Sequence, residues 1–245
     1  MHNIIRNTVA ILLLTTGIAS AAAVVVPNFS FENPDLADAA FTSATVSNDT
    51  TAVPGWVTTI NSGPGKIGVW NPQNPSFLGT TGPDPGGNVP GSAQGLQILY
   101  LAFNRGSGLE SVTSGTIAAI EANTTYLLTA AVGSDLFFNP DIVSIALLVN
   151  GAVAASSSTT GASIPNGGFI DVFTSFTTLP AGDPRVGGNL AIKLTSSTTN
   201  SSDIVQVNFD NIRVDASVPE PSTGALLLGG TLAIAFRRRK IAAIY

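Results

Sequence analysis

The chain has no cysteine and a single histidine, His2, which lies beside the initiating methionine. Removal of the N-terminus would therefore leave a protein with neither residue type. That composition excludes cysteine nucleophiles, Ser-His-Asp triads, disulfides and zinc sites built from thiolate or imidazole ligands. Only carboxylates, amides, hydroxyls and aromatic rings remain for chemistry.

Charged residues are also scarce, at 10% of the 245 residues. Between residues 24 and 217, fourteen acidic residues outnumber five basic ones, which gives a net charge of −9. A domain of this sign is repelled by nucleic acid and by anionic membrane surfaces, so we expect no nucleic-acid partner. The charge suits an extracytoplasmic domain that attracts divalent cations.

Residues 1–23 contain the three parts of a secretory signal peptide. Arg6 supplies the positive charge, an apolar run follows over residues 9–18, and small residues close the segment. The apolar run is shorter than the roughly 20 residues that a membrane-spanning helix needs. We predict a signal helix that signal peptidase removes after Ala21 or Ala23. A buried N-terminal helix is the alternative.

The stretch 218–245 has a second three-part pattern. Its motif is Val218, Pro219, Glu220, Pro221 and Ser222, and its basic cluster is Arg237, Arg238, Arg239 and Lys240. A short apolar run, residues 225–236, lies between them. By the positive-inside rule the basic cluster stays cytoplasmic, which predicts a short transmembrane helix and places the preceding domain across the membrane. A plain C-terminal membrane anchor is the alternative.

The ordered arrangement over residues 218–242 resembles the PEP-CTERM sorting signal of Gram-negative bacteria. The resemblance implies recognition by an exosortase, a membrane-bound, transpeptidase-like enzyme that removes the tail near Glu220. It further implies a transient inner-membrane intermediate, followed by export to the cell surface or the exopolysaccharide matrix. The protein would be the substrate of the sorting enzyme.

The intervening segment, 24–217, has the pattern of an all-β domain, because short runs of Val, Ile, Thr, Phe and Tyr alternate with clusters of Gly, Pro, Asn and Ser. We expect strands near 24–31, 53–59, 66–70, 95–103, 110–118, 124–133, 142–149, 152–157, 168–178, 189–196 and 204–214. Asn150-Gly151 predicts a type I′ hairpin turn, because both central residues of that turn need positive φ. So many short strands in one domain predict a two-sheet antiparallel β-sandwich, in the form of a jelly roll.

Three short anchors, at residues 27–34, 53–56 and 208–214, resemble galactose-binding-domain-like jelly rolls and related carbohydrate-binding modules. In that family the first and last strands are neighbours, which would bring Glu32 and Asp210 together. The resemblance implies a structural Ca²⁺ there, and hard oxygen ligands suit that ion. The alternative has both carboxylates capping turns, or pairing with Arg213 or backbone amides.

Trp70 ends a predicted strand directly before an irregular, proline-rich stretch, residues 71–94. An aromatic ring at such a position can stack on the apolar face of a sugar while the amides of Asn71 and Gln73 bind its hydroxyls. These three residues are the predicted glycan platform. Ordinary packing within the sandwich is the alternative for Trp70.

No catalytic pattern stands out, because most acidic residues lie in turn sequences and no phosphate-binding loop is present. We therefore expect a protein that is not an enzyme, exported to the cell surface or to the exopolysaccharide matrix of a biofilm. The alternative is a carbohydrate-binding module that recognises an extracellular polysaccharide. A polysaccharide-acting enzyme would need two carboxylates facing each other in a cleft.

Overall fold

The computed structural model of the protein describes residues 21–61, 65–72, 77, 93–104, 108–180, 182–199 and 204–218. Residues 21–217 form one compact unit with an apolar core of its own, so we expect this segment to fold independently. The predicted signal helix, the predicted transmembrane helix, the motif after Val218 and the basic cluster lie outside the described residues. In the described part of the chain, no helix is long and apolar enough to cross a membrane.

The described residues form twelve strands and one short 3₁₀ helix, η1. Their bounds are β1 Ala21–Val24, β2 Trp56–Ile60, β3 Gly65–Trp70, β4 Ile98–Asn104, β5 Gly108–Ser114, β6 Ala118–Ala119, β7 Thr125–Ser134, β8 Ile142–Val149, β9 Ala152–Thr160, η1 Gly161–Ser163, β10 Gly168–Thr177, β11 Asn189–Thr198 and β12 Ile204–Ser217.

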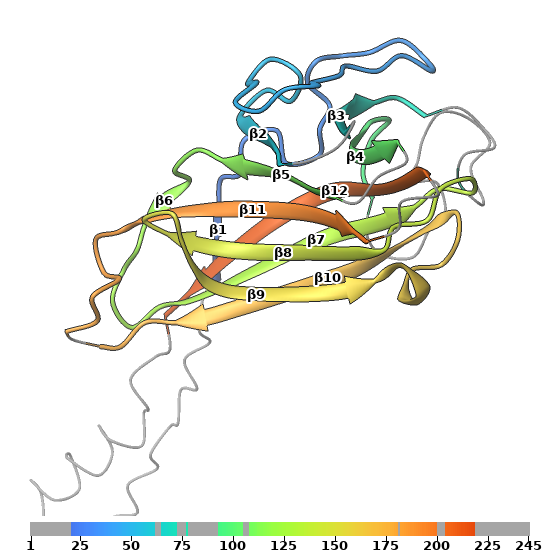
Figure 1. Ribbon diagram of the computed structural model, residues 1–245. Helices are drawn as coiled ribbons and strands as arrows, with labels where there is room; N and C mark the ends of the chain where they lie inside the picture. Colours follow the sequence, from blue (N-terminus) through green and yellow to red (C-terminus); the bar gives the residue numbers. More distant parts are fainter. Residues whose placement is uncertain are drawn as a thin grey trace, which may run out of the picture. The chain divides into compact units, whose positions relative to one another are not determined.

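The strands pair into two antiparallel sheets, which pack face to face (Figure 1). The first sheet has the order β10-β7-β12-β4-β3, with β1 added beside β12. The second has the order β2-β5-β11-β8-β9, with β6 added beside β11. β12 organises the first sheet, because β7 lies along one edge while β4 and then β1 pair with its other edge. The predicted two-sheet β-sandwich is confirmed.

Apart from the start of the domain, each predicted strand overlaps an observed one, and the predicted strand 110–118 is divided into β5 and β6. β1 spans residues 21–24 rather than 24–31, because its partner is the far end of β12, where Ala21 pairs with Ser217. The chain then turns over residues 27–30. The predicted hairpin is present, with φ of 50° at Asn150 and 80° at Gly151, as a type I′ turn requires.

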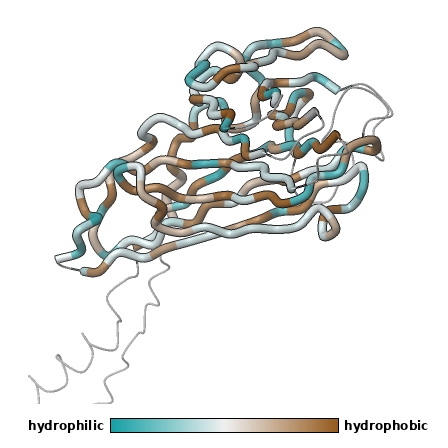
Figure 2. Tube along the Cα trace, viewed as in Figure 1, coloured by the Kyte–Doolittle hydropathy of each residue, from teal (hydrophilic) through white to brown (hydrophobic). Residues whose placement is uncertain are grey.

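Alternation along each strand builds the core. On β12, Val207 and Phe209 are buried between the sheets while the intervening side chains face away from them. Figure 2 shows the resulting mixture of apolar and polar residues along the strands. Trp56 is buried against Phe31, with ring centroids 5.8 Å apart, and its Nε1 donates a hydrogen bond of 3.1 Å to the Pro27 carbonyl. Replacing such a residue with alanine costs roughly 3–5 kcal/mol.

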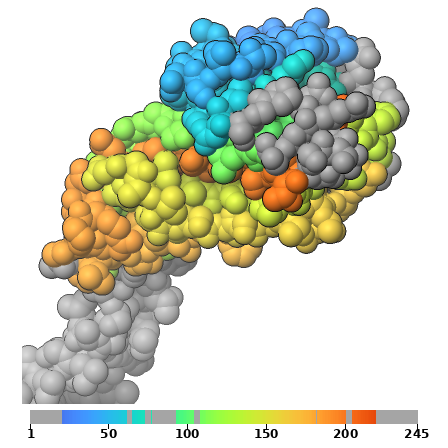
Figure 3. Space-filling model, viewed as in Figure 1, coloured from blue at the N-terminus to red at the C-terminus, as the bar shows by residue number. Residues whose placement is uncertain are grey.

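The segment that precedes β2 packs over the edge of the first sheet. It runs beside β3, where Thr42 N and Ala44 N donate to the carbonyls of Val69 and Ile67. Gly68 permits this close approach, because a Cβ at that position would lie 2.1 Å from the Thr42 carbonyl oxygen. In Figure 3 the N-terminal segment, in blue, lies over one end of the sandwich.

Candidate functional site

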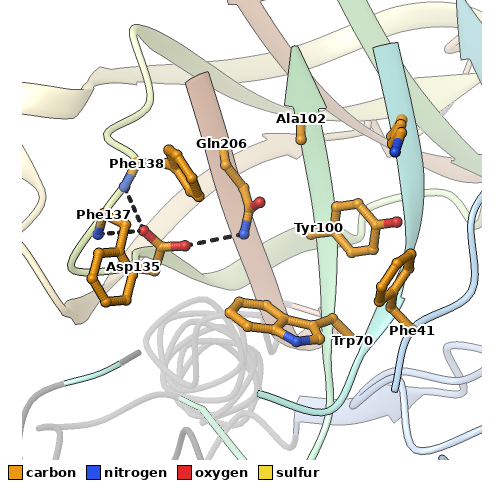
Figure 4. Close-up of a pocket in the computed structure, with 9 residues that line it drawn as sticks. Phe41, Trp70, Tyr100, Ala102, Asp135, Phe137, Phe138 and Gln206 are labelled. Carbon is orange, nitrogen blue, oxygen red and sulfur yellow. Dashed lines mark hydrogen bonds between the residues drawn. The ribbon is translucent and has the colours of Figure 1, made fainter. Parts of the chain in front are cut away.

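A cavity of about 430 Å³ lies on the outer face of the first sheet, away from the core (Figure 4). Three strands and two loops contribute to its lining. Lys66 and Trp70 come from β3, Tyr100 and Ala102 from β4, Gln206 from β12, Asp135, Phe137 and Phe138 from the stretch that follows β7, and Phe41 from the segment beside β3. A volume of this size accommodates a small organic molecule.

Aromatic rings form most of the wall. Phe41 and Tyr100 meet edge to face, with centroids 6.4 Å apart and planes at 85°. The Tyr100 hydroxyl donates to the Thr42 carbonyl at 2.7 Å, which holds this ring against the N-terminal segment. Phe137 lies on the opposite side and is 64% exposed. The rings therefore line a space that a flat apolar molecule can enter.

One carboxyl group, that of Asp135, lies among these rings and is almost completely buried. Its Oδ1 accepts hydrogen bonds from the backbone N–H groups of Phe137 at 2.8 Å and Phe138 at 2.6 Å, and its Oδ2 accepts one from Gln206 Nε2 at 3.3 Å. Burial raises the pKa of Asp135, and the two backbone N–H groups oppose that rise. A carboxyl with a raised pKa keeps its proton closer to neutral pH and can donate it.

Sequence reasoning did not identify Asp135. It lies one residue after a ten-residue strand, where an aspartate is typical of a turn, and its Oδ1 does cap the following turn. Phe137 and Phe138 beside it are the available signal, since two adjacent aromatic residues in a loop indicate a surface that binds or packs. Only the fold brings this turn next to Trp70 and Gln206.

Of the predicted glycan platform, Trp70 lies at the cavity, whereas Asn71 does not line it. Trp70 lines the cavity and packs against Phe77, with ring centroids 6.2 Å apart. Asn71 is buried, and its Nδ2 donates to the Leu36 carbonyl at 2.8 Å, so its side chain is engaged elsewhere. Gln73 lies outside the described residues. The glycan platform stays a prediction that rests on Trp70.

The predicted calcium pair, Glu32 and Asp210, converges on one short segment. Glu32 Oε1 accepts hydrogen bonds from the backbone N–H groups of Leu96 at 2.9 Å and Gln97 at 3.0 Å. Asp210 is fully buried, and its Oδ2 accepts one from the backbone N–H of Gln94 at 2.5 Å. Backbone amides are thus partners of both carboxylates, as the alternative interpretation requires. Among the described residues, no group of three or more His, Cys, Asp or Glu is placed to hold a metal ion, and calcium stays a prediction.

A second buried acid, Glu110 on β5, lies behind the floor of the cavity, inside the sandwich. A Cβ at Gly65 would lie 1.6 Å from its Oε1, so the carboxyl occupies the space that the missing side chain of β3 leaves free. The backbone N–H groups of Lys66 and Ala102 approach it without forming hydrogen bonds of good geometry. Burial raises the pKa of Glu110 to about 9, so the group is protonated at neutral pH.

Comparison with known proteins identifies two families. The model of the HpiC1-like family, described as HpiC1 cyclase, matches residues 22–215. The model of the PEP-CTERM protein-sorting motif matches residues 217–240. No curated protein sequence matches the chain significantly.

Two solved cyclase structures have the same fold as this chain. A Stig cyclase from Fischerella sp. TAU, in complex with (3Z)-3-(1-methyl-2-pyrrolidinylidene)-3H-indole, aligns with a TM-score of 0.61 at 23% identity, over 82% of this chain and 100% of that one. A cyclase from the same organism, in complex with 4-(1H-indol-3-yl)butan-2-one, has the same TM-score and coverage at 22% identity. A carbohydrate-binding module in complex with β-1,4-galactotriose aligns with a TM-score of 0.45 at 9% identity, over 79% of this chain and 98% of that one.

These comparisons confirm one expectation and overturn another. The PEP-CTERM resemblance is confirmed, and the motif implies export in a Gram-negative bacterium, a membrane-anchored intermediate and processing by an exosortase. The expectation that the protein is not an enzyme is wrong, because the family that matches residues 22–215 is one of cyclases. Triads and paired carboxylates are catalytic patterns that a sequence can reveal, and a lone carboxyl in an aromatic cavity has neither signature.

Proposed function

This chain belongs to the HpiC1-like cyclase family, and from that premise we propose that it is an exported cyclase that closes a ring in an aromatic small molecule. The observation that carries the proposal is the cavity, where aromatic side chains surround one buried carboxyl, that of Asp135. The rings bind and orient the ligand, and the carboxyl transfers the proton. No other carboxyl lines this cavity among the described residues.

The reaction that this arrangement favours is an isomerisation started by a proton. The protonated carboxyl of Asp135 gives its proton to an electron-rich carbon of the ligand, and the resulting cation forms a C–C bond with an alkene carbon of the same molecule. A second carbon then loses a proton to the Asp135 carboxylate, which restores the acid. Atoms and electrons balance within the ligand and the carboxyl, so no other reactant is needed. General acid catalysis of this kind contributes about 10²–10⁴-fold to a rate.

The aromatic lining of the cavity indicates the class of ligand that it would bind. Trp70, Tyr100 and Phe137 present ring faces and edges, and such surfaces stack on flat apolar molecules. The two cyclases of similar fold were solved with indole compounds, and an indole ring with an apolar side chain is of a size that the cavity admits. We therefore propose an indole-like substrate. After exosortase processing the enzyme would act at the cell surface or in the extracellular matrix.

Binding of 4-(1H-indol-3-yl)butan-2-one to residues 21–217, measured by calorimetry, tests the site. Trp70→Ala should weaken binding about tenfold, since an aromatic contact contributes roughly 0.5–1.5 kcal/mol. Phe173→Ala is the matched control, because Phe173 on β10 is 66% exposed and does not line the cavity. Equal affinities for wild type and Trp70→Ala would contradict the proposal. Saturable binding of β-1,4-galactotriose that Trp70→Ala abolishes would replace it with the glycan alternative.

Turnover in D₂O tests the role of the Asp135 carboxyl as the proton donor. Incubation with indoles that carry an alkene side chain should give an isomeric product in which one deuterium replaces a hydrogen, because the carboxyl proton exchanges with solvent before transfer and a proton is lost from a second carbon. Asp135→Asn should bind the probe and lose turnover by about 10²-fold or more. An Asp135→Asn variant with wild-type turnover would remove Asp135 from the mechanism.

A further inference from the structure

Gln206 connects Asp135 to the outer face of β12. Its Nε2 donates to Asp135 Oδ2 at 3.3 Å and to Asn208 Oδ1 at 2.9 Å. Gln206 and Asn208 are two residues apart on one strand, so their side chains lie on the same face. Figure 4 shows the Gln206 side chain between Asp135 and Tyr100, with its nitrogen directed at the carboxyl.

The two oxygens of Asp135 are not equivalent. Oδ1 accepts two backbone N–H groups, those of Phe137 and Phe138, and these are fixed by the turn itself. Oδ2 accepts only the longer bond from Gln206 among the contacts described here. A carboxyl proton on Oδ1 would face two backbone N–H donors, whereas Oδ2 has only one donor beside it and can also hold the proton. The transferable proton therefore belongs on Oδ2.

Asn208 orients the Gln206 amide. Asn208 is completely buried, so its side chain cannot swing away into solvent. If the Gln206 amide were reversed, its oxygen would face Asn208 Oδ1, and two acceptors would oppose each other. With Asn208 Oδ1 on this side, its 2.9 Å hydrogen bond from Gln206 Nε2 keeps the Gln206 N–H groups, rather than the oxygen, directed at Asp135.

We propose that Gln206 is the positioning residue of this site, and that its amide, held by Asn208, fixes Asp135 Oδ2 as the oxygen that exchanges a proton with the ligand. The role of Gln206 in turnover rests on the proposed function. Its physical basis is independent of any ligand, because a hydrogen-bond donor on Oδ2 stabilises the ionised form of the carboxyl.

Other titratable side chains at the cavity do not change in the experiment. Lys66 on β3 and Tyr100 on β4 line the cavity, and Glu110 on β5 lies behind its floor. All three remain in every variant described below, so a difference between variants reports the Gln206 contact.

The test is a carbon-13 NMR titration of the Asp135 carboxyl in residues 21–217, with the resonance assigned by its loss in Asp135→Asn. Gln206→Met keeps the length of the side chain and removes the donor, and it should raise the Asp135 pKa by about one unit, the size expected for a hydrogen bond to a charged group. Gln94→Met is the matched control, because the Gln94 side chain is exposed and its residue is not part of the cavity lining.

Gln206→Glu provides a second variant, which keeps the side-chain shape. A carboxyl placed beside Oδ2 should share a proton with Asp135, so the pair would titrate in two steps with the upper one above the wild-type pKa. An unchanged Asp135 titration in both variants would overturn the inference while probe binding could still support the proposed function. A shifted titration without any probe binding would instead retract the proposed function and limit Gln206 to a determinant of the Asp135 pKa.

Discussion

Glu110→Gln should stabilise the domain, and should do so increasingly as the pH rises. The carboxyl lies between the sheets, and burial raises its pKa from an ordinary 4.5 to about 9. The folded state therefore holds a proton that the unfolded state has released at every pH between these two values. The contribution of this proton to the free energy of unfolding is fully present below pH 4.5, and it is lost progressively as the pH rises towards 9.

The magnitude follows from the pKa difference. Each pH unit within the window lowers the free energy of unfolding by about 1.36 kcal/mol, which amounts to about 3 kcal/mol at pH 7 and about 6 kcal/mol at pH 9. Glutamine is neutral in both states and removes this dependence. A change of about 3 kcal/mol is a large part of the 5–15 kcal/mol that typically stabilises a domain.

Urea unfolding of residues 21–217 at several values between pH 6 and 9 measures the effect. The segment contains no histidine or cysteine, so none of its side chains ordinarily titrates in this range, and its terminal amine is the same in wild type and variant. Asp135 contributes equally to wild type and variant. Glu121→Gln is the matched control, because Glu121 is exposed. Parallel pH profiles for wild type and Glu110→Gln would refute the reasoning, as would the same gain in Glu121→Gln.

Two further predictions concern the Asp183–Arg185 ion pair and the calcium pair. Asp183 binds Arg185 through Oδ2 at 2.7 Å, and this contact holds the pKa of Asp183 well below its usual range. Asp183→Asn should therefore lower the melting temperature at neutral pH, and the difference should disappear as the pH falls through the acid range. An equal loss at pH 7 and in strong acid, well below pH 3, would contradict this ion-pair account. If Ca²⁺ joins Glu32 and Asp210, excess calcium should raise the melting temperature of the wild type and leave that of Asp210→Asn unchanged. Identical wild-type melting curves in calcium and in chelator would end the calcium prediction.

The sandwich could be predicted from the sequence because its signals are local. Alternation along β12 and the Asn150-Gly151 turn depend on neighbouring residues, and both are where the pattern placed them. The start of the domain was misplaced because the small residues at 21–23 suit a signal-peptide cleavage region and also an edge strand. Only pairing with the last residues of β12 decides that they form β1.

The site could be predicted only in part, because its residues come from segments far apart in the sequence. Trp70 stood out as an aromatic at the end of a strand, whereas Asp135 looked like an ordinary turn aspartate. What distinguishes Asp135 is its burial at a cavity that is also lined by rings from β3, β4 and the N-terminal segment. That environment depends on strand order, which no local pattern specifies. Glu110 was hidden for the same reason, since the space it fills arises from Gly65 in the opposite sheet.

A crystal structure of residues 21–217 with 4-(1H-indol-3-yl)butan-2-one tests the central claim most directly. The account predicts that the indole ring lies against Trp70 and Phe137 and that a ligand atom is within hydrogen-bonding distance of Asp135 Oδ2. A ligand bound elsewhere on the domain, or bound in the cavity with Asp135 out of reach, would contradict the assignment of this cavity as the active site.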